Sequence, residues 1–478
     1  MFFVFYNVKQ LDNYVSLTEL SLSITILLIG AFVTFFILNI ILNYKIKSGL
    51  LIIWLTVILI FYSDIYYFLK DIAFIESILR HRYLVALLAI SWVLLFLFIR
   101  KSSKNFTPLN HYLNVLTALF FTIELAFVIH NHFTERQWKD FISIEDKNPK
   151  IDTAAIAGKA TSEHPSVYFI LLDAYINSNS LKKHWGFDNS EFLSSLKGNG
   201  FHIVEHAKSN YDATIYSMPS MLNMDYLPDL SHITNEITIN TICRAWLKRS
   251  AVTAEFKKAG YEFINLSFFD IHEQPSTIEF DDLMLHGLSF YKHLFKKTMP
   301  GRIMADTYHT TLKPNRAVSM VEKAGELAET HHDNPLFVYS HALMPHRPYY
   351  FDGEGILYEN GLGKYPDDEQ KSYLEHLKYG NKITLETVER ILKAEPDATI
   401  IIQGDHGAQI FEKEEDNRLE VYNTFCAIRF ASGNYQNIPE DMTPVNLFRI
   451  VLNENTGKNY PMLEDKQELW TVNQHFDS

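Results

Sequence analysis

The sequence has little cysteine: Cys243 and Cys426 are far apart and stand in no CxxC pattern. This excludes a zinc cluster held by several thiolates. A Cys243–Cys426 disulfide stays open, but two buried free thiols are the preferred interpretation, because free cysteine behaves as a small buried hydrophobe. Long lysine or arginine runs are also lacking, and the formal net charge is −13, so nucleic acid is not an expected partner.

Hydrophobic residues make up 47% of the chain, and the excess over what a soluble core needs lies before residue 131. No small-residue cleavage site follows the first apolar stretch, so it is interpreted as an anchor and not as a removable signal peptide. A membrane span takes about 17–25 residues. We therefore predict a helical membrane anchor over residues 1–131 with about four spans, at Leu20–Tyr44, Leu50–Leu69, Tyr83–Ile99 and Leu109–His130.

The basic residues between these stretches indicate an orientation. Lys45 and Lys47 lie between the first two spans, and Arg100, Lys101 and Lys104 lie between the last two. The positive-inside rule makes both loops cytoplasmic, although the intervening loop also carries basic residues. The prediction is an integral protein of the bacterial cytoplasmic (inner) membrane whose remaining residues lie on the outer, periplasmic face.

The chain after the anchor has a different pattern. A polar linker is expected over residues 132–165, and from residue 166 to 478 apolar, β-branched runs alternate with helical stretches. The runs are 167–174, 261–269, 335–343, 398–407 and 423–430, and the clearest helices are 250–260 and 370–394. This alternation predicts an α/β domain with a mostly parallel central sheet covered by helices on both faces.

Acids and imidazoles follow several of the predicted strands. Asp173 ends the first run, His341 and His346 end the third, and Asp405 and His406 end the fourth. Ligands in such sheets bind beyond the carboxyl ends of the strands, and two carboxylates with an imidazole suit a zinc- or manganese-type cation. Each residue also has a structural interpretation as a helix cap, a turn residue or a core histidine. Their combination favours a metal site.

A hydroxyl-rich segment, NYDATIYSMPSMLNMDYL at residues 210–227, follows the first of these runs. Thr214, Tyr216, Ser217 and Ser220 all lie in it. A hydroxyl is a poor nucleophile until a base or a metal activates it, so the segment gains meaning from the predicted metal site.

These motifs resemble the alkaline-phosphatase superfamily over residues 166–430, in particular its membrane-anchored, sulfatase-like branch of lipoteichoic acid synthases and phosphoethanolamine transferases. In that family an acid after the first strand, a threonine and an Asp-His pair bind one metal. The resemblance implies that Asp173, Thr214, Asp405 and His406 are the ligands. DATIYSMPSM is similar to the transferase nucleophile segment, which makes Thr214 the nucleophile.

The stretch HALMPH keeps the two histidines that the family places five residues apart. The resemblance implies that His341, His346 and the adjacent Arg347 face the substrate, with His346 protonating the leaving oxygen. It implies one divalent cation, zinc or manganese, with magnesium or calcium as alternatives. A second metal stays open, because no histidine follows DHGAQIFEKEEDNRL where those enzymes have another ligand.

The expected function is a metal-dependent, membrane-anchored transferase or hydrolase that acts on phosphate esters or diesters of envelope lipids or glycans through a covalent Thr214 intermediate. Two alternatives stay open. SMPSM resembles the sulfatase signature, in which Cys or Ser precedes x-Pro-x-Arg, although Met221 replaces the arginine; that enzyme would use Ser217. The other alternative is a catalytically silent component of envelope assembly.

Overall fold

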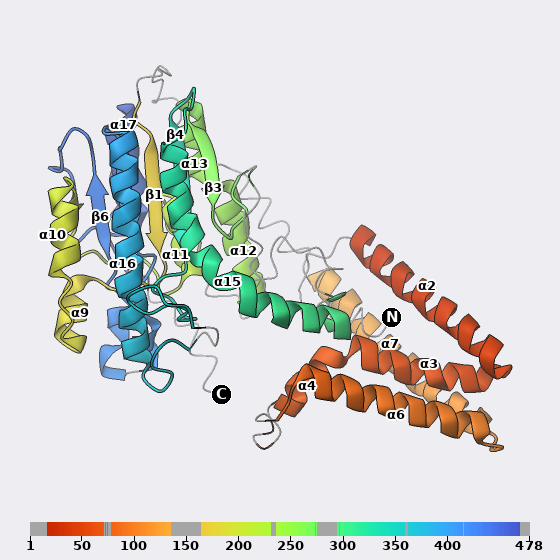
Figure 1. Ribbon diagram of the computed structural model, residues 1–478. Helices are drawn as coiled ribbons and strands as arrows, with labels where there is room; N and C mark the ends of the chain where they lie inside the picture. The colour runs from red at the N-terminus through yellow and green to blue at the C-terminus, as the bar shows by residue number, and fades with distance from the viewer. Residues whose placement is uncertain are drawn as a thin grey trace. The chain divides into compact units, whose positions relative to one another are not determined.

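The computed structural model describes residues 17–70, 72, 74, 78–134, 164–230, 236–272, 274, 294–295, 297–358, 362–413 and 415–468. It forms two compact units. Figure 1 shows their helices and strands, coloured from the N-terminus to the C-terminus. Unit 1 holds Met1–Ile144 and Asp281–His309, and unit 2 holds Glu145–Phe280 and Thr310–Ser478. Most of the predicted linker, residues 135–163, lies outside the described residues.

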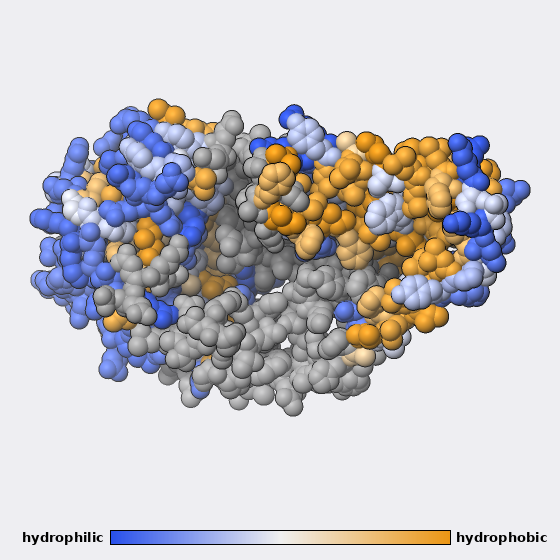
Figure 2. Space-filling view, turned by 90° about the horizontal axis from the view of Figure 1, so that it is seen from below, coloured by the Kyte–Doolittle hydropathy of each residue, from blue (hydrophilic) through white to orange (hydrophobic). Residues whose placement is uncertain are grey.

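Unit 1 is helical, and the face of it that Figure 2 shows is largely hydrophobic, with hydrophilic residues at one end. Its elements are α2 (Leu17–Leu42), α3 (Lys45–Ile60), α4 (Tyr62–Lys70), α6 (His81–Lys101), α7 (Thr107–Thr134) and the first part of α15 (Met299–Ala328). Among the described residues, Ser21–Leu42 and α6 are long and apolar enough to cross a membrane, and α3 with α4 qualifies as a pair bent by 60°. The count is two spans, or three with the bent pair, so four spans stay a prediction.

Unit 2 contains a six-stranded sheet in the order β2-β6-β5-β1-β4-β3. Strands β3, β4, β1 and β5 run parallel, whereas β6 is antiparallel to β5 and β2 is antiparallel to β6. The α/β fold with a mostly parallel sheet is therefore confirmed, and run 423–430 supplies an antiparallel strand. The bounds are β1 (Val167–Leu172), β2 (His202–Ile203), β3 (Glu262–Leu266), β4 (Leu336–Ala342), β5 (Thr399–Gln403) and β6 (Cys426–Arg429).

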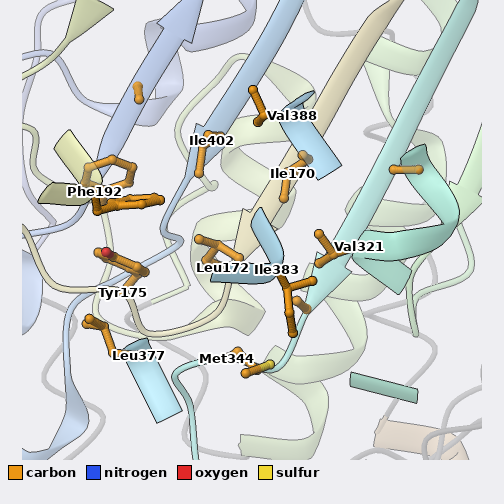
Figure 3. Packing of buried hydrophobic residues seen from close by; sticks show 14 of the residues in the cluster. Ile170, Leu172, Tyr175, Phe192, Val321, Met344, Leu377, Ile383, Val388 and Ile402 are labelled. Carbon is orange, nitrogen blue, oxygen red and sulfur yellow. The ribbon is translucent and has the colours of Figure 1, made fainter. Parts of the chain in front are cut away.

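Helices cover both faces of this sheet, as continuous apolar strands require. All six residues of β1 are buried, and successive side chains point to opposite faces. Ile170 and Leu172 belong to the cluster that packs against α15 and α16 (Glu369–Ala394), as Figure 3 shows. Phe169 packs on the other face, with its ring 5.0 Å from that of Phe448 in α17 (Pro444–Thr456).

The remaining helices of unit 2 are α9 (Ser178–Trp185), α10 (Ser190–Gly198), α11 (Thr214–Asn223), α12 (Glu236–Arg249) and α13 (Ala251–Lys258), with the 3₁₀ segments η2 (Gln409–Lys413) and η3 (Glu415–Tyr422). The helices expected at 250–260 and 370–394 correspond to α13 and α16. Cys243 and Cys426 are free and buried, which confirms the preferred interpretation.

Candidate active site

The carboxyl ends of β1 and β5 bring distant parts of the chain together. In the parallel pairing, Leu171 lies opposite Gln403, so the residues that follow leave the sheet at the same edge. There, Asp173, Asp405 and His406 each offer one ligand atom, and these atoms lie within 4.8 Å of one another. All three side chains are buried. The structure thus gathers three of the four predicted metal ligands.

The Asp405 carboxylate is held through one of its two oxygens. Oδ1 accepts hydrogen bonds of 3.0 Å from the backbone amides of Ala174 and His406. Ala174 has a φ of +60°, a left-handed conformation that a residue with a Cβ seldom adopts. Such strain persists only where surrounding contacts determine it. The other oxygen, Oδ2, is buried without a hydrogen-bond partner and is available to a cation.

Two glycines allow the backbone around this pair to pack closely. A Cβ on Gly404 would lie 2.3 Å from Oγ1 of Thr424, and one on Gly407 would lie 2.7 Å from the carbonyl oxygens of Asn423 and Glu420. Real Cβ atoms almost never approach so near. The glycines in QGDHG therefore serve a structural need: they let the loop between β5 and η2 press against residues 420–424.

The tautomer of His406 follows from its contacts. Nδ1 lies 2.8 Å from the carbonyl oxygen of Gly407, which can only accept, so Nδ1 carries the proton. Nε2 then presents a lone pair. It lies 3.5 Å from Oδ2 of Asp405 and 3.8 Å from Oδ1 of Asp173, the orientation that a metal ligand needs.

Asp173 is likewise held through one oxygen. Its Oδ2 lies 3.4 Å from Nε2 of His341, and Nδ1 of that ring lies 2.7 Å from the Tyr339 hydroxyl. Oδ1 is buried and has no hydrogen-bond partner. Burial raises the pKa of the Asp173 carboxyl, but the charge of His346 and the hydrogen bond from His341 outweigh burial and lower it. The carboxylate form is therefore favoured.

Thr214 is the first residue of α11, and its side chain is partly exposed. Its hydroxyl lies 3.3 Å from Nε2 of His406, one of the three gathered ligands. The other two aliphatic hydroxyls of the segment point elsewhere: Ser217 donates to the carbonyl of Tyr211 at 3.1 Å, and Ser220 donates to that of Asp225 at 2.7 Å. Both serines are buried.

The two histidines of HALMPH occupy different environments. His341 is fully buried between Tyr339 and Asp173, whereas His346 is partly exposed. The backbone amide of His346 donates to the carbonyl of Asp173 at 3.0 Å, which ties this loop to the end of β1. Arg347 is exposed and pairs with Glu369 at 3.2 Å. His346 and Arg347 are thus exposed enough to face a substrate. His341 is buried and is instead placed to orient the Asp173 carboxylate.

Two further residues at this site were not singled out from the sequence. Asp212, two residues before Thr214, is partly buried and lies near His406, and burial raises the pKa of its carboxyl. The only sign of Asp212 in the sequence was its position two residues before Thr214, within NYDAT. Tyr339 gave no signal, because a tyrosine inside a buried strand is ordinarily a core residue.

The donor set fits a divalent cation. Oδ1 of Asp173 and Oδ2 of Asp405 are buried without partners, a state that costs free energy unless a ligand satisfies them. The unprotonated Nε2 of His406 completes a group of two carboxylate oxygens and one imidazole, to which the Thr214 hydroxyl is adjacent. Zinc and manganese both accept such ligands.

Comparison with known proteins places this site inside a recognised domain. A family model described as Sulfatase matches residues 168–467. No curated protein matches the chain.

Similar solved structures include the C-terminal periplasmic domain of EcEptC from Escherichia coli (11% identity, 66% of this chain and 92% of that chain, TM-score 0.43). Another is a putative sulfatase from Bacteroides thetaiotaomicron, with 14% identity, coverage of 64% of this chain and 74% of that chain, and a TM-score of 0.40. A third is the lipoteichoic acid synthase LtaP from Listeria monocytogenes, with 12% identity, coverage of 65% of this chain and 78% of that chain, and a TM-score of 0.36. These likenesses are too distant to assign a reaction.

Proposed function

Because the chain belongs to the Sulfatase family, we propose that it is a metal-dependent, membrane-anchored phosphoryl-group transferase or hydrolase. One observation carries this proposal: the Thr214 hydroxyl lies 3.3 Å from Nε2 of His406, in a buried group with Asp173 and Asp405, each of which has one carboxylate oxygen without a hydrogen-bond partner. The substrate class is a phosphate ester or diester of an envelope lipid or glycan. The covalent intermediate forms on Thr214.

The contacts of the candidate hydroxyls support Thr214 over Ser217 as the nucleophile. The Ser217 side chain is 2% exposed, and its hydroxyl donates to a backbone carbonyl. An attacking Ser217 would have to leave this hydrogen bond and reach the substrate from a buried position. Thr214 is already partly exposed at the edge of the sheet, so the sulfatase alternative needs a rearrangement that phosphoryl transfer through Thr214 does not.

Asp173, Asp405 and His406 would hold one divalent cation, zinc or manganese by their ligand types. When bound, it would lower the pKa of the Thr214 hydroxyl and offset negative charge on a phosphoryl oxygen. The first amides of α11 have no acceptor within the helix, as at any helix start, and favour an anion there. A phosphate at Thr214 would thus be stabilised both by the proposed cation and by these amides.

The side chain of His346 is assigned the proton transfers. As the Thr214 oxygen forms its bond to phosphorus, the bond to the departing oxygen breaks, and that oxygen needs a proton. Nδ1 of His346 is close to the carbonyl oxygen of Arg347 and donates to it, which leaves Nε2 to give up the proton. The same nitrogen then takes a proton from the accepting hydroxyl or water. Arg347 would bind a non-reacting oxygen of the substrate.

His341 is assigned a positioning role instead of the substrate contact that the family resemblance implies. Its Nε2–H donates to Asp173, and its Nδ1 accepts from the Tyr339 hydroxyl. This chain of hydrogen bonds holds the Asp173 carboxylate through Oδ2 and would leave Oδ1 available to a cation. Outer partners of this kind tune metal affinity without touching the substrate.

The apolar helices of unit 1 support a location at a membrane. We propose that unit 2 lies on the periplasmic face of the bacterial inner membrane, where envelope lipids and glycans are the available phosphate donors.

The test is to incubate the metal-loaded full chain with a chromogenic phosphodiester and an aryl sulfate, quench rapidly, and search the peptides by mass. We expect phosphodiester turnover and a phosphorylated peptide containing Thr214. Turnover of the sulfate alone, with a modified Ser217, would establish the sulfatase alternative. Absence of turnover and of bound metal would favour the silent component.

A further inference from the structure

A segment from within the matched Sulfatase region belongs to the helical unit. Asp281–His309 lies inside residues 168–467, yet it is grouped with Met1–Ile144 in unit 1. Its described residues include 294–295 and 297–304, which lead into α15. Helix α15 then ends in unit 2. The chain therefore passes between the two units a second time, well after the predicted linker in sequence.

One side of this segment packs against the membrane-anchor helices. Met299 and Ile303 lie against the buried cluster around Tyr62. The Arg302 guanidinium lies 5.1 Å from the Tyr67 ring centroid, and Lys297 Nζ lies 3.8 Å from Oδ1 of Asp64. Asp64, Tyr67 and Tyr62 all belong to α4, so the segment runs along that helix.

The same region also exposes large apolar side chains. Phe295 is 45% exposed and Met304 is 61% exposed, and on α4 Tyr67 and Phe68 are 43% and 70% exposed. Basic residues lie at the same end of the helices: Lys70, Arg80 and Arg82 are exposed. Aromatic, apolar and basic side chains at the ends of membrane helices are the composition of the bilayer interface, where rings sit at headgroup level and cations meet anionic lipids.

We propose that residues 294–295 and 297–304, together with α4 and the start of α6, form a lipid-docking surface, which inserts Phe295 and Met304 at the headgroup–acyl boundary and contacts anionic headgroups through Lys70, Arg80 and Arg82. Two observations select a lipid surface over a protein partner. The exposed side chains are continuous with α6, which meets the length and hydropathy of a span, and with α4, which does so only together with α3 as a bent pair. The polar groups around them are predominantly basic, although the whole chain carries a net charge of −13.

This surface would hold a segment from the middle of the matched Sulfatase region at the membrane. The inference does not depend on the chemistry at Thr214: a chain without activity would dock in the same way. It assigns a function to residues 294–295 and 297–304, none of which belongs to the candidate active site.

The test uses site-directed spin labels attached to introduced cysteines. The two native cysteines, Cys243 and Cys426, are free but buried, so a label should react mainly with the introduced one. Single variants Phe295→Cys and Met304→Cys of the full chain are labelled in nanodiscs of phosphatidylcholine and phosphatidylglycerol at a ratio of about 3:1. Met462→Cys is the matched control, because Met462 is a 42%-exposed methionine of unit 2. We expect collisions with oxygen to dominate at positions 295 and 304, and collisions with a water-soluble nickel chelate to dominate at 462.

A second measurement tests the headgroup contact. The accessibility of the label at 304 to the nickel chelate should rise when phosphatidylglycerol is omitted, and Arg82→Gln should remove this dependence. Lys371→Gln, at an exposed lysine of unit 2, should leave the dependence unchanged. Labels at 295 and 304 that match position 462 would overturn the proposal. Labels shielded from both reagents would also overturn it and indicate a protein partner instead.

Discussion

Removing the Thr214 hydroxyl should lower mainly the catalytic rate, whereas removing the Ser217 hydroxyl should lower mainly the stability of the fold. In Thr214→Ala, the lost hydrogen bond to His406 is long, at 3.3 Å, and the side chain is partly exposed. We therefore expect a change in unfolding free energy of about 0.5 kcal/mol or less. If Thr214 forms the covalent intermediate, turnover should fall roughly 10⁴-fold or more, as losses of covalent nucleophiles do.

Ser217→Ala should lower the stability of the fold more than the catalytic rate. It removes a buried hydrogen bond of 3.1 Å to the Tyr211 carbonyl, which contributes about 1 kcal/mol. For a domain of this size the midpoint of thermal unfolding should fall by about 2–4 °C, while kcat stays within about tenfold of the parent value. Thr214→Ser should retain part of the activity, because the attacking oxygen remains and only a methyl group is lost.

The assay combines thermal unfolding of each purified variant with initial rates on a phosphodiester and on an aryl sulfate. Metal content is measured in the same samples, so that a lost ion is not mistaken for a lost nucleophile. The reasoning is refuted if Ser217→Ala abolishes sulfate cleavage while Thr214→Ala retains it. Equal losses in both variants with an intact thermal transition would also contradict the assignment of Ser217 to structure.

Three further predictions concern the metal, the loop that holds its ligands and the orientation of the chain. Asp405→Asn should strongly reduce the bound metal while the protein stays folded, because Oδ1 keeps its two amide donors and the side chain loses its charge. An unchanged metal content in the purified variant would show that Asp405 is not a ligand. Gly407→Ala should destabilise unit 2 by about 1–3 kcal/mol and weaken metal binding, because its Cβ would lie 2.7 Å from two carbonyl oxygens and the shift would turn the His406 ring. Gly198→Ala, whose Cβ would meet nothing within 4 Å, is the control, and equal midpoints of chemical unfolding would contradict the steric argument. Alkaline phosphatase and fluorescent protein fused after residue 140 should report the periplasmic side, and a cytoplasmic signal would refute the proposed orientation.

The strands that carry the site were predictable because burial on both faces leaves a clear pattern. VYFILL is apolar at every position, and it forms β1 at the centre of the sheet. The short strand β2 gave no such pattern. Its two residues, His202 and Ile203, join the sheet through pairing with β6, a tertiary contact that local sequence does not reveal.

The candidate site could be predicted in part. Asp173, Asp405 and His406 follow strands whose parallel pairing places them together, so strand ends alone indicated their proximity. Thr214 follows no strand end, and only the motif resemblance pointed to it. The burial of His341 depends on which face of β4 it occupies and on the Tyr339 hydroxyl beside it. The return of residues 281–309 to unit 1 gave no sequence signal that we recognised, because the apolar positions 295, 299, 303 and 304 also suit an ordinary core helix.

The position of β5 in the sheet has a consequence for the order in which the protein matures. Strand β5 pairs directly with β1, although Ala174 and the Asp405 carboxylate that it contacts are 231 residues apart in sequence. At typical synthesis rates, on the order of ten seconds or more separate the emergence of the two carboxylates from the ribosome. During that interval the proposed pair of metal-binding carboxylates is incomplete, and a chain interrupted before residue 405 has only half of the predicted ligands. If these residues bind the proposed cation, its uptake would follow closure of the sheet, and a truncated chain would not retain the ion.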